Sequence, residues 1–76
     1  MNKEFEKSVR DIKKYLHRGD IKRIAERAGC SQPTVTFVLQ KAREPERLTD
    51  MQLKAYTTAK EVSEENKAAL EAAIAQ

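Results

Sequence analysis

The side chains best suited to chemistry in this 76-residue chain lie close together, between positions 31 and 37. Ser31 and Thr34 carry hydroxyl groups that can hydrogen-bond to phosphate oxygens. Gln32 carries an amide that can form two hydrogen bonds to an adenine, and Thr36 combines a hydroxyl with a methyl group suited to a thymine. Phe37 could press on thymine methyl groups or fold back into a core. These side chains predict contact with duplex DNA rather than catalysis.

A short helix is predicted to precede them, over residues 21–28. Its apolar residues recur at spacings of three and four, which places them on one helical face. They are Ile21, Ile24, Ala25 and Ala28. Asp20 is predicted to be the N-cap, and Gly29 is placed to end the helix in the left-handed conformation. Cys30, in the following turn, is expected to fill the corner between two helices.

A second helix is predicted to begin after Ser31, whose hydroxyl can accept a hydrogen bond from a free N–H group of the first turn. Pro33 fits that turn because its missing N–H is not required there. The buried face of the helix is predicted to hold Val35, Val38 and Leu39. The two helices and their turn span residues 21–39, with the polar side chains of the second helix facing outward.

An ordinary pair of packed helices would show the same apolar spacing, so periodicity alone does not indicate DNA binding. The joint pattern is more specific. Ala25 supplies a small residue where the helices cross, Gly29 follows four residues later, and valines lie four and seven residues beyond the Ser31 cap. The surrounding charge is also basic. We therefore favour DNA binding over simple packing.

A family resemblance rests on these same residues. Ile24-Ala25, Ala28-Gly29-Cys30-Ser31 and Thr34-Val35-Thr36, with Val38-Leu39, resemble the helix-turn-helix of lac-repressor-type regulators. The wider lambda-repressor-like group, which includes Cro and the phage repressors, shares much of the pattern. The resemblance covers about Asp20 to Leu39 and, more loosely, the next helix. It implies a compact all-α domain of four to five helices with a central helix-turn-helix and a long C-terminal helix.

In that family the second helix of the motif lies in the major groove, where its early residues contact base edges. The resemblance therefore implies that the helix over residues 32–41 enters the groove. The base-facing side chains would be Gln32, Pro33, Thr36 and Phe37. Lac-type proteins often carry polar or arginine side chains where this chain has Pro33 and Phe37, so the resemblance implies no particular operator sequence.

The flanks of the same helix are predicted to contact phosphate. Residues 42–48 break the helix at the Glu44-Pro45 step, because a residue before proline is pushed out of the α region. Arg43 and Arg47 bracket this loop, at the place where the resembled families contact the DNA backbone. The residues predicted to contact phosphate are Ser31, Thr34, Gln40, Lys41, Arg43 and Arg47. Exposed loop arginines without any partner are the alternative.

The net charge of +3 is unevenly distributed. Residues 1–48 hold 12 Lys/Arg and 7 Asp/Glu, a net +5, whereas residues 49–76 hold 3 and 5, a net −2. A basic body suits a surface that faces phosphate. The length allows one domain, 1–76, with a small core.

Membrane and enzyme functions find no support in the sequence. No apolar run is long enough to span a membrane, and none follows a basic start as in a signal peptide. Cys30 is the only cysteine, so we expect a reducing cytoplasm and a bacterial or phage-encoded, nucleoid-associated protein. His17 has no partner nucleophile or metal ligands at a suitable spacing. We expect no enzyme activity, metal, cofactor or small-molecule ligand.

An N-terminal helix is predicted from about Asn2 to His17. Its apolar residues fall at steps of four, three and four, on one face. They are Phe5, Val9, Ile12 and Leu16. Asn2 should cap this helix and Gly19 should end it. The helix would pack across the motif and complete a core that two helices alone could not form.

A C-terminal helix is predicted to begin at Asp50, because Thr49 and Gln52 form a capping box. Its early apolar residues are expected to close the core. They are Met51, Leu53, Ala55, Tyr56 and Ala59. No glycine or proline follows, which favours one helix to about Ala75. Ser63 could instead cap a separate short helix.

The same helix carries small residues at alternating steps of four and three, a heptad-like seam. Its members are Ala55, Ala59, Val62, Asn66, Ala69 and Ala73. Helix-turn-helix proteins commonly bind as two-fold dimers with half-sites about 34 Å apart. We therefore expect a homodimer through residues 50–75. The alternative is a solvated helix in which alanine serves helix propensity.

The sequence predicts a sequence-specific regulator of transcription that binds double-stranded DNA, such as a small repressor or a phage or mobile-element control protein. Its partners would be duplex DNA and a second copy of the chain. The alternative is a small helical protein-interaction module whose hairpin merely resembles the motif.

Overall fold

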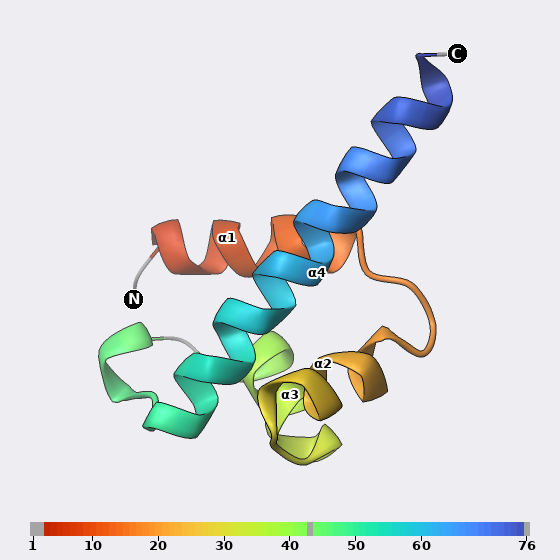
Figure 1. The fold of residues 1–76 in the computed structure, drawn as a ribbon. Coiled ribbons are helices and arrows are strands. Elements are labelled where there is room, and N and C mark those ends of the chain that lie inside the picture. The colour runs from red at the N-terminus through yellow and green to blue at the C-terminus, as the bar shows by residue number, and fades with distance from the viewer. Residues whose placement is uncertain (1–2, 43, 76) are drawn as a thin grey trace.

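Two helices from the ends of the chain cross each other, and two shorter helices pack below them (Figure 1). The computed structural model describes residues 3–42 and 44–75. In chain order the helices are α1 (Lys3–Lys14), α2 (Asp20–Ala28), α3 (Gln32–Gln40) and α4 (Asp50–Ile74), with one turn of 3-10 helix at Pro45–Arg47. Over the described residues the fold is all-helical with a long C-terminal helix, as predicted.

The N-terminal helix α1 has the predicted buried face and ends earlier than predicted. Its buried residues are Phe5, Val9 and Ile12. The helix stops at Lys14, so the prediction that Gly19 ends it was wrong. The chain turns away at Tyr15, whose carbonyl oxygen accepts a hydrogen bond of 2.8 Å from the side-chain amide of Asn66. Asn2, the predicted cap, lies outside the described residues.

Asp20 is the first residue of α2 rather than its N-cap. Gly19 takes the cap position at a φ of 92°, a left-handed conformation that suits glycine, and no side chain caps this helix. The Asp20 carboxylate is instead buried, and it accepts hydrogen bonds from the backbone N–H of His17 (2.8 Å) and the side chain of Asn66 (2.9 Å). The loop between α1 and α2 is thereby tied to α4.

The local electrostatics keep this buried carboxylate charged. Burial makes the largest contribution and raises the pKa of Asp20. The two hydrogen bonds and the electrostatic interactions with His17 and Arg23 together outweigh burial, so that the pKa lies below its usual value. Asp20 therefore acts as an anionic anchor for α4.

The turn between α2 and α3 has the predicted geometry. Gly29 adopts the left-handed conformation at a φ of 74°, and its N–H donates to the Ala25 carbonyl oxygen. The Ser31 side chain accepts a hydrogen bond of 3.4 Å from the Thr34 N–H at the start of α3. Cys30 is half-buried against the core. The buried residues of α3 are Val35, Val38 and Leu39, as predicted.

The long helix α4 is continuous. Its capping box is complete, because Thr49 accepts from the Gln52 N–H and the Gln52 side chain accepts from the Thr49 N–H. Ser63 is buried within the helix, so it does not cap a separate one. None of the described helices combines the length and apolar character needed to cross a membrane.

The predicted core contribution of α4 is confirmed in part. Ala55 and Ala59 are fully buried, and the Tyr56 ring lies 5.2 Å from the ring of Phe5. Met51 and Leu53 do not close the core, because they are 46% and 40% exposed. In the first turns of α4, the face with Ala55 and Ala59 packs against the other helices, and the face with Met51 and Leu53 is exposed.

The heptad-like seam is used inside the monomer. Its first three members are fully buried in the core, and Asn66 donates both of its hydrogen bonds within the chain. These positions cannot form a seam with a second copy that keeps this fold. The last turns of α4 project beyond the other helices, where Leu70 and Ile74 are 50% and 73% exposed (Figure 1).

Candidate nucleic-acid interface

Five side chains of α3 and its end line one shallow hollow on the surface. They are Gln32, Pro33, Thr36, Phe37 and Lys41. The first four are the residues predicted to face bases, and Lys41 was predicted to contact phosphate at the end of the helix. The structure thus brings the predicted base-facing residues together on the outer face of α3.

The outer face of α3 is exposed, because the helix packs against the core through its inner face. Val35 and Val38 are at most 1% exposed, whereas the Phe37 between them in sequence is 41% exposed. Phe37 therefore does not fold back into the core, the other outcome left open by the sequence. An aromatic ring of this size that stays in water is a candidate contact for a partner.

The N-terminal end of α3 carries two hydroxyl groups that are bonded to each other. The Ser31 and Thr34 oxygens lie 2.8 Å apart. Ser31 is exposed and Thr34 is half-buried. Each hydroxyl has one proton, and the bond between them uses one of the two, so this pair keeps one proton that it can donate to a phosphate oxygen. The cap is therefore compatible with the predicted phosphate contact.

The other predicted phosphate contacts are spread along the C-terminal side of α3. Gln40 and Lys41 are exposed. Arg47 is also exposed, but its Nε atom lies 2.8 Å from a carboxylate oxygen of Glu44, so this arginine already has an acidic partner. Arg43 lies outside the described residues. A phosphate would have to compete with Glu44 for Arg47.

Lys41 lines the hollow together with the base-facing residues, a position that was not predicted from the sequence. The signal was present, because Pro33, Phe37 and Lys41 are spaced at i, i+4 and i+8 and form one column on a helix. Lys41 directly follows the last residue of α3, and its backbone N–H donates to the Phe37 carbonyl oxygen. The helical geometry thus continues far enough for Lys41 to line the same hollow as Phe37.

A second missed feature is an ion-pair cluster on the outer face of α2. One Glu65 oxygen lies 2.8 Å from an Arg23 guanidinium nitrogen, and the other lies 2.9 Å from an Arg27 nitrogen. The hydrogen bond with Glu65 raises the pKa of Arg27, and the hydrogen bond from Arg27 lowers the pKa of Glu65. Residues about forty positions apart are joined here, which local spacing cannot predict.

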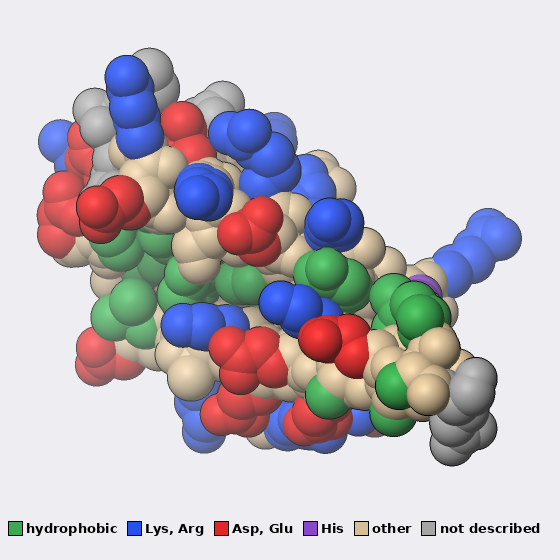
Figure 2. Space-filling model, turned by 90° about the horizontal axis from the view of Figure 1, so that it is seen from above, with side chains coloured by type: hydrophobic (Ala, Val, Ile, Leu, Met, Phe, Trp, Pro, Cys, Tyr) green, Lys and Arg blue, Asp and Glu red, His purple; other side chains and the backbone are tan. Residues whose placement is uncertain are grey.

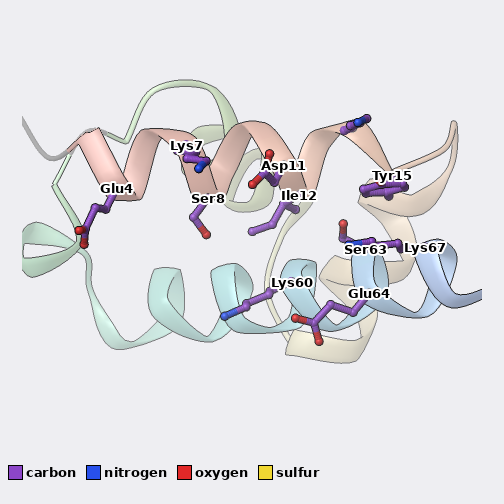
Figure 3. Close-up of a pocket in the computed structure, with 11 residues that line it drawn as sticks. Glu4, Lys7, Ser8, Asp11, Ile12, Tyr15, Lys60, Ser63, Glu64 and Lys67 are labelled. Carbon is purple, nitrogen blue, oxygen red and sulfur yellow. The ribbon is translucent and has the colours of Figure 1, made fainter.

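A longer groove runs between α1 and α4, on a different face of the molecule (Figure 3). Its charged lining mixes both signs, with Lys7, Lys14, Lys60 and Lys67 beside Glu4, Asp11 and Glu64. Figure 2 shows this alternation over the α1 and α4 side, with apolar side chains in the band between. Such a lining favours neither a phosphate nor a cation, so α3 is the better candidate site.

The described residues contain no group of three or more His, Cys, Asp or Glu side chains that could hold a metal ion. Comparison with models of protein families, with curated proteins and with solved structures found no match. The function is therefore inferred from the residues and their geometry.

Proposed function

We propose that this chain is a sequence-specific regulator of transcription that binds duplex DNA by inserting α3 into the major groove. The observation that carries the proposal is the division of α3 into two faces. Its inner face is buried, and its outer face presents an amide, a hydroxyl, an aromatic ring and an ammonium group around one hollow. An α-helix fits the major groove, and these groups match the donors, acceptors and methyl groups of base edges.

The distribution of charge supports the same function. The first 48 residues carry a net +5, which attracts the polyanionic DNA backbone before specific contacts form. One acidic residue of α4, Glu65, instead lies beside cations of the chain itself, Arg23 and Arg27. The chain would act as a small repressor or a control protein of a phage or mobile element, with the outcome set by the position of its operator.

The regulator is further proposed to act as a homodimer. A single recognition helix reads few base pairs, and two copies would read half-sites about 34 Å apart. The support within the structure is the projecting end of α4, where Leu70 and Ile74 are exposed. Sedimentation of the wild-type chain should show a dimer that the Ile74→Lys variant weakens. A wild-type chain that stays monomeric at high micromolar concentration would remove the dimer from the proposal.

The salt dependence of binding tests the proposal. The logarithm of the affinity for duplex DNA should fall linearly with the logarithm of the salt concentration, with a slope of about 0.9 per phosphate contacted. Lys41→Ala should weaken binding, whereas Lys60→Ala removes an equal charge from the α1–α4 groove and should have a smaller effect. Binding that ignores salt and both substitutions would favour the protein-interaction module.

Sequence preference tests the role of α3 itself. Gln32→Ala should relax the preference at one base pair by about 1–3 kcal/mol and leave other positions unchanged. Selection of binding sites from random duplexes, with the wild type and the variant, measures this directly. Equal enrichment of sites by both proteins would show that Gln32 does not read a base.

A further inference from the structure

The hollow on α3 is apolar at its centre and polar at its two ends. Pro33, Thr36 and Phe37 lie between Gln32 and Lys41 along the helix, and these three residues are here called the apolar centre. Gln32 lies toward the N-terminal end of the helix and Lys41 just beyond the C-terminal end. A surface that only contacted phosphate would have no use for this apolar centre, because phosphate oxygens require hydrogen-bond donors and positive charge.

The length of the apolar centre corresponds to nearly two base-pair steps. An α-helix rises 1.5 Å per residue, so Pro33 and Phe37 are separated by about 6 Å along the axis. Successive bases on one DNA strand are separated by about 3.4 Å along the duplex. A side chain column of this length therefore spans nearly two base-pair steps and can face two to three neighbouring base pairs when the helix lies along the groove.

Only one apolar group is available in the major groove of ordinary DNA. It is the C5-methyl group of thymine, which cytosine lacks unless it is methylated at the same carbon. The exposed Phe37 ring and the Pro33 ring offer carbon surface to such a group, and none of the side chains that line the apolar centre is charged. Gln32 is then placed to pair with a neighbouring adenine through its amide.

We propose that this hollow binds the C5-methyl groups of one or two consecutive pyrimidines, so that the chain discriminates methylated from unmethylated pyrimidine at these positions. The ligand is a duplex with thymine, or with 5-methylcytosine in its place. This inference rests on the proposed DNA binding and specifies what α3 reads. It makes Phe37 the main determinant of specificity and Pro33 its support.

The test removes methyl groups without changing base pairing. A duplex is selected from a random pool by its affinity for the wild-type chain, and each thymine is then replaced by uracil in turn. At one position, or at two adjacent positions, the dissociation constant should rise about fourfold, which corresponds to about 0.8 kcal/mol for one buried methyl group. Cytosine at those positions should bind more weakly than 5-methylcytosine.

The Phe37→Ala variant supplies the second arm. It should bind the thymine and uracil duplexes equally, and its helicity should match the wild type because Phe37 lies outside the core. Met51→Ala is the matched control, since it removes an apolar side chain of similar exposure from the first turn of α4, outside both the hollow and the projecting end of α4. This control should keep the wild-type preference for thymine over uracil.

The possible failures separate the two proposals. Uracil tolerated at every position, while binding keeps its salt dependence and its Gln32-dependent preference, would overturn the methyl-binding hollow and leave DNA binding intact. A Phe37→Ala variant that still discriminates uracil from thymine would overturn it as well. A chain that binds no duplex at all would overturn both proposals, and Phe37 would then be a contact for a protein partner.

Discussion

The two helices α2 and α3 are both nine residues long, and they use their outer faces in opposite ways. The outer face of α2 is tied to α4 through Arg23 and Arg27, which share Glu65, while its first residue, Asp20, is held by Asn66. The outer face of α3 is uncharged along the helix and exposes Phe37.

The difference shows that cationic residues are not equally available to an outside partner. Arg23 and Arg27 contribute to the basic charge of the N-terminal two thirds, but each already has a carboxylate partner. The contacts of α2 fix the position of α4, and α4 in turn supports α3 through the shared core. The outer face of α2 therefore contributes to the stability of the fold, whereas the outer face of α3 stays exposed.

The largest loss of stability should follow from substitutions on the buried inner faces of α2 and α3, where the two helices are alike. Ile24 on α2 is fully buried. Ile24→Ala should lower the free energy of unfolding by about 2–5 kcal/mol, because it removes apolar contacts and leaves a cavity. Urea denaturation followed by circular dichroism measures this loss. A loss below about 1 kcal/mol would mean that the cavity collapses or that α2 contributes little to the core.

The second largest loss of stability should follow from removing Asn66, which anchors α4 to the Asp20 carboxylate of α2. Asn66→Ala leaves the Asp20 carboxylate and the Tyr15 carbonyl without one hydrogen bond each. The free energy of unfolding should fall by about 1–3 kcal/mol, because the variant loses a hydrogen bond to a charged carboxylate, which keeps its bond from the His17 N–H, and a second one to the Tyr15 carbonyl. Glu64→Ala, at an exposed position of the same helix, is the control and should have a smaller effect. Equal losses in the two variants would show that the Asn66 hydrogen bonds do not stabilise the fold.

Asn66 also shows where prediction from sequence fails. Its place in a spacing of small residues predicted a polar position in a dimer seam, yet its partners lie 46 and 51 residues away in the same chain. The end of α1 at Lys14 was missed for a related reason, since the loop that follows it is held by this distant contact. Periodicity reports which residues share a face, not which helix covers that face.

Local signals, by contrast, predicted the framework of the candidate site. Gly29, Ser31 and the capping box at Thr49 act through their nearest neighbours in the chain, so their effect can be read from the sequence. The exposure of Phe37 was open to two interpretations, because its neighbours Val35 and Val38 fit the buried face without excluding it. Tertiary packing decides that exposure, and the ligand of this face stays a prediction.

The start of α3 depends on a side-chain cap, whereas α2 begins without one. Ser31→Ala should therefore lower the free energy of unfolding by about 1 kcal/mol, because the Thr34 N–H loses its acceptor. Ser31→Gly is the matched comparison. It should lower the free energy of unfolding by only a few tenths of about 1 kcal/mol, since glycine is itself tolerated at the N-cap position. Thermal denaturation of both variants separates the two values. Identical melting would show that α3 is held by its packing alone.

The smallest effect should come from the ion pairs on the outer face of α2. Glu65→Gln removes the shared carboxylate, and exposed pairs of this kind are screened by salt, so the loss of stability should be small and should shrink further as salt is added. Its pH dependence is the sharper measurement. The pKa of Glu65 is lowered in the folded chain, so its contribution is fully present above its ordinary value of 4.5 and is lost as the pH falls through the lowered folded value.

The difference in unfolding free energy between the wild type and Glu65→Gln should accordingly vanish in acid. The pKa of Asp20 is also lowered, but Asp20 is present in both proteins, so its contribution to stability drops out of this difference. Glu64→Gln removes an equal charge at the neighbouring position of α4. It is the control and should change stability less at neutral pH, because Glu64 has no ion pair within the described residues. If both variants behave alike, the α2 arginines are not held by Glu65. They would then be as free for a phosphate as Lys41, and the contrast between the two helices would disappear.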